Sequence, residues 1–137
     1  MGTSLAGCSV LIAEDEFLVA FHWETVLEEH GASVKTAASV EDAMPAAQDG
    51  IDCAVLDVSL LDGDVFPIAD ILQARGIPFV FHSGHANLDD LVGRYPGAEA
   101  LTKPATEAVM VRALERVLQT KATNGVPDQV AGSTSNA

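Results

Sequence analysis

The stretch "VLIAEDE", residues 10–16, decides the fold class because a short apolar run ends abruptly in three carboxylates. A run of four apolar residues is typical of a strand that is buried on both faces. Glu14, Asp15 and Glu16 follow it directly. Neighbouring carboxylates repel one another, and an unpaired buried charge is costly, so such groups are normally solvated, paired or bound to a cation. We therefore ask which positive group these carboxylates would bind.

Similar apolar runs alternate with helical patterns along the rest of the chain. Strands are expected at residues 10–13, 33–37, 53–56, 77–81 and 98–101. Helices are expected at residues 16–30, 40–48, 65–75, 88–94 and 106–121. Strands that alternate with helices predict an α/β fold, with a doubly wound parallel sheet and helices on both of its faces.

Apolar spacing and capping residues support the individual helices. In the first helix Trp23 and Leu27 lie on one face, and Gly31 marks its end. Ser39 is a plausible N-cap of the second helix, although Pro45 interrupts that helix. The last helix is expected to bury one apolar face, formed by Val109, Ala113, Leu114 and Val117.

Composition limits the class of protein and its partners. The chain has 137 residues, 48% of them hydrophobic, which suggests one globular domain. We expect an N-terminal arm at 1–7, the domain at 8–121 and a disordered tail at 122–137. The net charge of −13 disfavours nucleic acid and membrane surfaces as partners. Two cysteines and no apolar segment of membrane-spanning length indicate a cytoplasmic protein with reduced thiols.

Polar side chains follow four of the five expected strands. Glu14 and Asp15 end the first, Asp57 ends the third, Ser83 ends the fourth, and Lys103 follows the fifth. Functional groups of open parallel sheets gather at the carboxyl ends of the strands, so these side chains should meet. The carboxylates suit Mg²⁺. An ammonium and a hydroxyl could then bind phosphoryl oxygens, and an Asp can accept a phosphoryl group.

In their order and spacing these residues resemble the receiver domain of bacterial two-component response regulators. The resemblance covers roughly residues 8–120 and rests on Glu14-Asp15, Asp57, Ser83 and Lys103-Pro104. The run 81–85, "FHSGH", further resembles a receiver subset whose fourth strand reads Phe-Ala-Thr-Gly followed by Tyr or a similar residue. The resemblance implies a flavodoxin-like (β/α)5 fold with strand order 2-1-3-4-5.

The resemblance also implies a role for each site residue. Asp57 would accept a phosphoryl group from a sensor histidine kinase or a histidine phosphotransfer protein, as a signalling phospho-acceptor and not as an enzyme. Asp15 and Asp57 would bind Mg²⁺ directly, Glu14 through water, and Ser59 through its backbone carbonyl. Lys103 would pair with the phosphoryl oxygens, and Ser83 would move toward them. No cofactor other than Mg²⁺ is implied.

Some positions depart from the family pattern. The turn after Asp57, "VSLLDGD", is shorter than usual and lacks the common Met-Pro. Ala100 stands three residues before Lys103, where the family often has a switching Tyr or Phe, and Ala105 replaces a common Phe. The short turn shifts the backbone near the metal, whereas the changes at Ala100 and Ala105 affect the route by which a signal leaves the site and not the phosphorylation chemistry.

The same residues also allow other interpretations. Glu14 and Glu16 could merely cap the following helix. His82 and His85 could form a transition-metal site with Asp57, although a position for His85 at the rim of the site is favoured.

Two alternative functions remain beside a receiver. A haloacid-dehalogenase-like phosphohydrolase also uses Asp, Mg²⁺ and Lys, but it needs a second Asp where this chain has Ser59. The other is an interaction domain that is never phosphorylated, against which the intact Asp57, Asp15 and Lys103 argue. We expect a stand-alone receiver whose output is contact with a downstream protein target or competition for phosphoryl groups.

Overall fold

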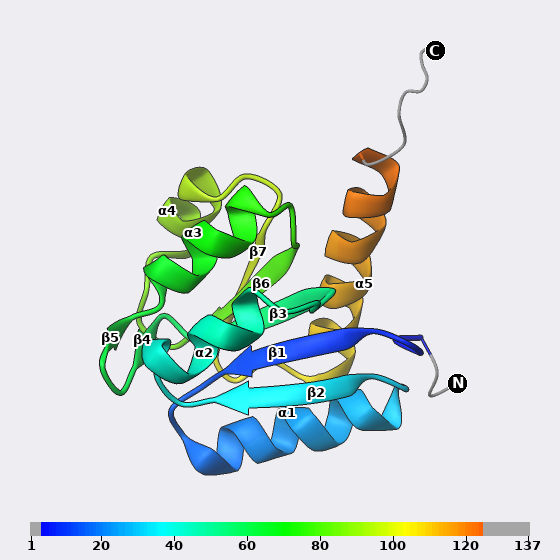
Figure 1. The fold of residues 1–137 in the computed structure, drawn as a ribbon, viewed down its shortest axis with the longest axis horizontal. Helices are drawn as coiled ribbons and strands as arrows, with labels where there is room; N and C mark the ends of the chain where they lie inside the picture. The colour runs from blue at the N-terminus through cyan, green and yellow to red at the C-terminus, as the bar shows by residue number, and fades with distance from the viewer. Residues whose placement is uncertain (1–3, 125–137) are drawn as a thin grey trace.

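Five parallel strands form the central sheet, and the computed structural model describes residues 4–124 around it (Figure 1). The strands are β1 (Ser9–Ala13), β2 (Ser33–Ala37), β3 (Cys53–Leu56), β6 (Phe79–Ser83) and β7 (Glu99–Thr102). Their order in the sheet is β2-β1-β3-β6-β7, and every neighbouring pair is parallel. This is the predicted order 2-1-3-4-5 for these five strands, so the predicted fold class is confirmed.

Helices cover both faces of the sheet, as predicted. They are α1 (Phe17–Glu29), α2 (Val40–Ala47), α3 (Phe66–Ala74), α4 (Leu88–Arg94) and α5 (Glu107–Asn124). Buried side chains of α2, α3 and α4 form one apolar cluster with the sheet, and those of α1 and α5 form the other. In Figure 1, α1 runs beneath β1 and β2.

Burial on both sides explains why the central strands are almost free of polar residues. Along β1, Leu11 belongs to the cluster with α2, α3 and α4, whereas Ile12 belongs to the cluster with α1 and α5. Phe81 and Val80 of β6 divide in the same way. Alternate residues of a strand point to opposite faces, so both faces of these strands favour apolar side chains, and the buried polar exceptions His82 and Ser83 stand at the carboxyl end of β6.

Local signals in the sequence account for where the first two helices begin and end. Trp23 and Leu27 of α1 are buried, as their spacing predicted. Gly31 follows with a φ of +94°, and a Cβ there would lie 2.9 Å from the Cα of Ala6. Only glycine combines that backbone conformation with so close an approach. The Ser39 hydroxyl accepts a hydrogen bond from the Asp42 N–H at 3.0 Å, which confirms Ser39 as the N-cap of α2.

The two ends of the domain differ from the sequence-based expectation. Leu5 lies in the expected arm but is completely buried in the cluster with α1 and α5, and its N–H donates to the His30 carbonyl at 2.9 Å. Helix α5 continues to Asn124, three residues into the expected tail, and residues 125–137 of that tail lie outside the described part. On α5, Val109 is 43% exposed, and Met110 takes its expected place in the core.

A small antiparallel hairpin follows β3 and was not predicted. It pairs β4 (Ser59–Leu60) with β5 (Gly63–Asp64). The Asp62-Gly63 dipeptide is a known hairpin signal and could have revealed it. The carboxylate of Asp62 accepts hydrogen bonds from the N–H groups of Val40 and Glu41, at 2.7 and 3.1 Å. These N–H groups have no partner within the helix, and their bonds to Asp62 fasten the hairpin to the start of α2.

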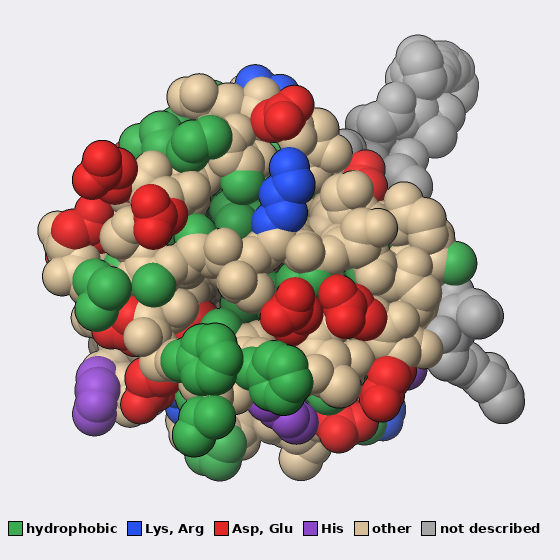
Figure 2. All heavy atoms as spheres, turned by 60° about the horizontal axis from the view of Figure 1, so that its bottom comes forward, with side chains coloured by type: hydrophobic (Ala, Val, Ile, Leu, Met, Phe, Trp, Pro, Cys, Tyr) green, Lys and Arg blue, Asp and Glu red, His purple; other side chains and the backbone are tan. Residues whose placement is uncertain are grey.

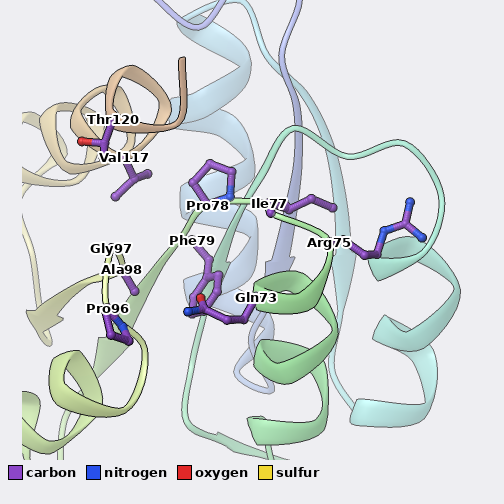
Figure 3. A pocket seen from close by; sticks show the side chains of 11 residues that line it. Gln73, Arg75, Ile77, Pro78, Phe79, Pro96, Gly97, Ala98, Val117 and Thr120 are labelled. Carbon is purple, nitrogen blue, oxygen red and sulfur yellow. The ribbon is translucent and has the colours of Figure 1, made fainter. Parts of the chain in front are cut away.

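A hollow of about 470 Å³ opens at the amino ends of β6 and β7, away from the strand ends predicted to be functional (Figure 3). Its walls are largely apolar and include Ile77, Pro78, Phe79, Pro96, Ala98 and Val117. Arg75 is the one charged residue that lines it, and its side chain extends away from the others in Figure 3. Without a convergent set of polar groups, this hollow is a weak candidate for a chemical site.

No helix within residues 4–124 is both long and apolar enough to cross a membrane.

Candidate functional site

The carboxyl ends of the strands bring the predicted site residues together. Backbone hydrogen bonds continue past the strands, from the N–H of Asp57 to the carbonyl of Ala13 at 2.8 Å and from the N–H of Lys103 to the carbonyl of Ser83 at 3.0 Å. A pocket of about 460 Å³ lies there, and Asp15, Asp57, Ser59, Ser83 and Lys103 are among the residues that line it. Residues up to 88 positions apart in sequence therefore share one site, as the strand-end rule predicted.

Three carboxylates form the acidic part of this site. Glu14, Asp15 and Asp57 each place one oxygen within 4.8 Å of the others. Glu14 and Asp57 are 4% and 8% exposed, so they lie deep, whereas Asp15 is partly exposed in the pocket wall. Hard divalent cations such as Mg²⁺ prefer carboxylate and carbonyl oxygens and retain several waters. This set of ligand atoms, open on one side, fits such an ion.

Lys103 neutralises part of this negative charge. Its Nζ lies 3.0 Å from a Glu14 oxygen, 3.0 Å from Oδ2 of Asp57 and 3.6 Å from a Glu16 oxygen. Burial by itself would lower the pKa of Lys103, but hydrogen bonds to Glu14 and Asp57 outweigh it, so the pKa is raised. Lys103 is therefore a fixed cation beside the Asp57 carboxylate.

Burial dominates the ionisation of Glu14. It raises the pKa of Glu14 to about 7, against the opposing effects of the Lys103 ammonium and the Glu16 N–H. The like charge of Asp57 adds a smaller upward contribution. One carboxyl of this site thus takes up a proton more readily than an ordinary Glu does.

Both serines of the site form hydrogen bonds that involve backbone N–H groups, Ser83 as an acceptor and Ser59 as a donor. The Ser83 hydroxyl accepts hydrogen bonds from the N–H of His85 at 3.3 Å and of Ala86 at 3.1 Å, so it faces the loop after β6. Ser59 is exposed at the start of the hairpin, and its N–H donates to Oδ1 of Asp57 at 3.4 Å. Ser59 thus stands beside Asp57, where its carbonyl was expected to help bind the metal.

Glu16 does not cap the following helix, in contrast to the interpretation that the sequence allows. Its side chain makes no capping hydrogen bond to α1. It lines the pocket and lies 3.6 Å from the Lys103 ammonium. Its own N–H donates to a Glu14 carboxylate oxygen at 3.1 Å. Glu14 is thus the carboxylate that receives an N–H at the start of the helix, and Glu16 adds negative charge to the pocket rim.

The histidines do not form a metal site with Asp57. In the described part of the chain, the sole His, Cys, Asp and Glu group with metal-binding spacing is the three-carboxylate cluster. His85 is exposed and lines the pocket, which matches its expected position at the rim. His82 is 3% exposed. Its ring contacts Trp23, on the face of the sheet that α1 and α5 cover.

Sequence comparison settles the family of this chain. The model of the response regulator receiver domain matches residues 10–115. The chain belongs to the response regulator receiver domain family. The match contains every predicted site residue from Glu14 to Lys103. The proposed resemblance is therefore confirmed, and no finding supports the haloacid-dehalogenase alternative. No curated protein sequence matches the chain.

Solved structures of receivers share this fold. A response regulator receiver protein from Sinorhizobium medicae WSM419 is 27% identical, with a TM-score of 0.77 over 85% of this chain and 98% of that one. The non-phosphorylated HemR receiver domain from Leptospira biflexa is 25% identical, with a TM-score of 0.72 over 81% and 94%. A CheY-like receiver from Methanospirillum hungatei JF-1 is 20% identical, with a TM-score of 0.77 over 86% and 98%, and supports the fold alone.

Proposed function

We propose that this receiver accepts a phosphoryl group on Asp57, with Mg²⁺ bound, from a phosphohistidine of a sensor histidine kinase or a histidine phosphotransfer protein. The observation that carries the proposal is the position of the Asp57 carboxylate. The carboxylate belongs to the same acidic cluster as Glu14 and Asp15, and its Oδ2 lies 3.0 Å from the Lys103 ammonium. A nucleophilic carboxylate that belongs to a cation-binding cluster and also contacts a fixed cation is suited to phosphoryl transfer.

In the transfer, a carboxylate oxygen of Asp57 attacks the phosphorus, and the bond from phosphorus to the donor's imidazole nitrogen breaks. The imidazole keeps the electron pair and leaves neutral, because its other nitrogen already carries the proton. Lys103 pairs with one phosphoryl oxygen as the negative charge spreads over the group. Ser83 donates its hydroxyl hydrogen to another, for which it turns away from the loop after β6.

The metal would be held by Asp15 and Asp57 directly, by Glu14 through water and by the carbonyl of Ser59. When bound, Mg²⁺ draws negative charge from the phosphoryl oxygens. His85, which is exposed and lines the pocket, would tune the access of water to the phosphoryl group.

The protein donor would dock on the first turns of α1. Phe17, Leu18 and Phe21 are 77%, 75% and 56% exposed, and the rings of the two phenylalanines stack at 6.2 Å. Figure 2 shows this hydrophobic patch, with acidic side chains beside it. The patch begins immediately after Glu16, which lines the pocket, so a protein docked on it lies next to the entrance to Asp57. We propose that the donor presents an apolar surface with basic residues around it, which complements the exposed apolar side chains and the net charge of −13.

Labelling with a small phosphodonor tests the acceptor. With acetyl phosphate and Mg²⁺, we expect one added phosphoryl group by intact-mass spectrometry, and none in Asp57→Asn. Asp49→Asn, which changes an exposed Asp outside the pocket, should label like the wild-type protein. Full labelling of the Asp57 variant would disprove the assignment of this residue.

A comparison of two phosphodonors tests the docking surface. Replacing Phe17 and Phe21 by Ser removes exposed apolar area, so transfer from the cognate phosphorylated protein should slow at least tenfold. Labelling by acetyl phosphate needs no docking and should keep its rate. Val92→Ser, at a 41% exposed position on α4, is the matched control and should behave like the wild-type protein. Equal slowing with both donors would place the defect in the site and not in docking.

A further inference from the structure

His82 lies directly before Ser83 in β6, on the face that packs against α1 and α5. Its ring meets the Trp23 ring edge-on, with 5.6 Å between centroids and an interplanar angle of 88°. Its Nε2 accepts a hydrogen bond from the N–H of Ala105 at 3.3 Å. Ala105 lies two residues after Lys103, in the segment between β7 and α5. A buried imidazole thus joins the strand that ends in Ser83 to the loop that carries Lys103.

Two consecutive residues of β6 hold this loop at two points. The Ser83 carbonyl accepts a hydrogen bond from the Lys103 N–H at 3.0 Å, on the near side of Pro104. The His82 ring accepts one from the Ala105 N–H, on its far side. Fixing both ends of a three-residue segment restricts the backbone from which the Lys103 side chain extends toward Asp57.

The imidazole is neutral at physiological pH and therefore able to accept a hydrogen bond. Burial lowers the pKa of His82 to about 4, and the positive charge of Lys103 and the neighbouring His22 act in the same direction. The negative charge of Asp57 opposes them. In a neutral imidazole one nitrogen carries the proton and the other accepts, so acceptance at Nε2 places the proton on Nδ1.

We propose that His82 is a positioning residue for phosphoryl transfer: through its hydrogen bond to Ala105 it holds the segment 103–105 so that the Lys103 ammonium stays on Asp57. This inference rests on the proposed function of Asp57 and Lys103. The His82 ring touches neither of the reacting groups in the structure. If the His82 ring only filled space in the core, any side chain of similar size could replace it. This difference separates a positioning role from a packing role.

Two substitutions at His82 separate hydrogen bonding from packing. His82→Phe keeps an aromatic ring and removes the acceptor, whereas His82→Gln retains an acceptor at a similar reach. We expect acetyl phosphate to label His82→Phe roughly threefold to tenfold more slowly, which is the effect of losing one neutral hydrogen bond. His82→Gln should recover most of the rate. The matched control is His22→Phe, since the His22 ring also contacts Trp23, with 4.7 Å between centroids, but is exposed. It should label at the wild-type rate.

Nuclear magnetic resonance gives readouts that do not depend on labelling. In the wild-type protein the ring nitrogens of His82 should show a proton on Nδ1 and none on Nε2. The Cε signal of Lys103 should shift in His82→Phe and not in His82→Gln. If the wild-type protein is not labelled at all, the proposed function fails, while these signals still decide the positioning.

Three results would overturn the inference. One is a proton on Nε2 in the wild-type protein, a result that needs no folded variant. Another is a wild-type rate together with an unchanged Lys103 signal in His82→Phe. The third is equal slowing of His82→Phe and His82→Gln, which would make the role purely structural.

Discussion

Glu14 couples the charge of the site to the stability of the fold. Its pKa rises from 4.5 to about 7, chiefly because it is buried. A carboxyl whose folded pKa lies above its unfolded pKa favours folding while it is protonated. This contribution is complete below pH 4.5 and is lost as the pH rises through about 7. Without metal, therefore, the ionised Glu14 destabilises the protein near neutral pH.

Mg²⁺ should reverse this loss, because a bound cation favours the ionised carboxylates. At a hundredfold excess over Kd the ion contributes about 2.7 kcal/mol of stability by mass action. We expect the increase in melting temperature with Mg²⁺ to be larger at about pH 8 than at about pH 6, since Glu14 must lose its proton. Thermal melts with and without a fixed concentration of Mg²⁺ at each pH measure this increase.

Asp15→Ala should remove most of the Mg²⁺ response, because it deletes a partly exposed carboxylate of the cluster. Asp49→Ala deletes an exposed carboxylate outside the pocket and should keep the full response. An identical response in the wild-type protein and Asp15→Ala would mean that the ion binds elsewhere.

Helix α4 is fixed at its C-terminal end by Tyr95. Tyr95 is 3% exposed, and its ring centroid lies 5.5 Å from that of Phe81 and 5.6 Å from that of Phe79. Its hydroxyl donates to the Asp70 carboxylate of α3 at 2.6 Å. Burial and the hydrogen bond to Asp70 raise the pKa of Tyr95 to about 12. The C-terminal end of α4 is thus fastened to α3.

Tyr95→Phe should destabilise the fold by about 1 kcal/mol, because it removes the hydrogen bond and keeps the ring. The raised pKa means that the tyrosine favours folding below about pH 10 and that this contribution is lost as the pH rises through about 12. The wild-type protein should therefore lose its advantage over Tyr95→Phe in that range, measured by urea unfolding. With Asp70→Ala already present, Tyr95→Phe should cost little more. Full additivity of the two changes would mean that the hydrogen bond contributes nothing.

The sequence predicted elements whose cause is local or periodic. The strands were found because burial on both faces requires apolar runs, and the acidic site followed because parallel strands end at one edge. Contacts between side chains of separate elements left no such signal. The hydrogen bonds of His82 with Ala105 and of Tyr95 with Asp70 join residues 23 and 25 positions apart. Val109 was misplaced because several faces of α5 carry apolar residues at helical spacing.

The whole molecule divides into two sides around one sheet. The side with α1 and α5 carries the exposed aromatic patch, Trp23 and the His82 contact. The side with α2, α3 and α4 carries the aromatic cluster around Tyr95, and Ala100 packs against it. The site lies at the carboxyl ends of the strands, next to both faces of the sheet. We infer that the phosphodonor acts from the first side, and that a change of state appears on the second.

Phosphorylation should alter the loop after β6 and the start of α4. We infer that the Ser83 side chain changes rotamer to donate to a phosphoryl oxygen, and that this rotation breaks the hydrogen bonds it accepts from the N–H groups of His85 and Ala86. Gly84 follows Ser83 directly and has no side chain that would hinder this movement. A Cβ added there would lie 3.8 Å from the Lys103 side chain. Ala100 has no ring that could change rotamer. The loop therefore loses two anchors at once, while Tyr95 still holds the far end of α4.

Amide exchange with and without beryllium fluoride, a phosphoryl mimic, tests this change. Protection should change most within residues 84–94, and most strongly at the loop, because segments with few buried contacts open at low free-energy cost. Helices α1 and α3 and the surroundings of Ala100 should change little. Ser83→Ala lacks both anchors from the start, so its loop should exchange fast in either state while the mimic still binds. A response confined to α1, or none with the mimic demonstrably bound, would contradict this route.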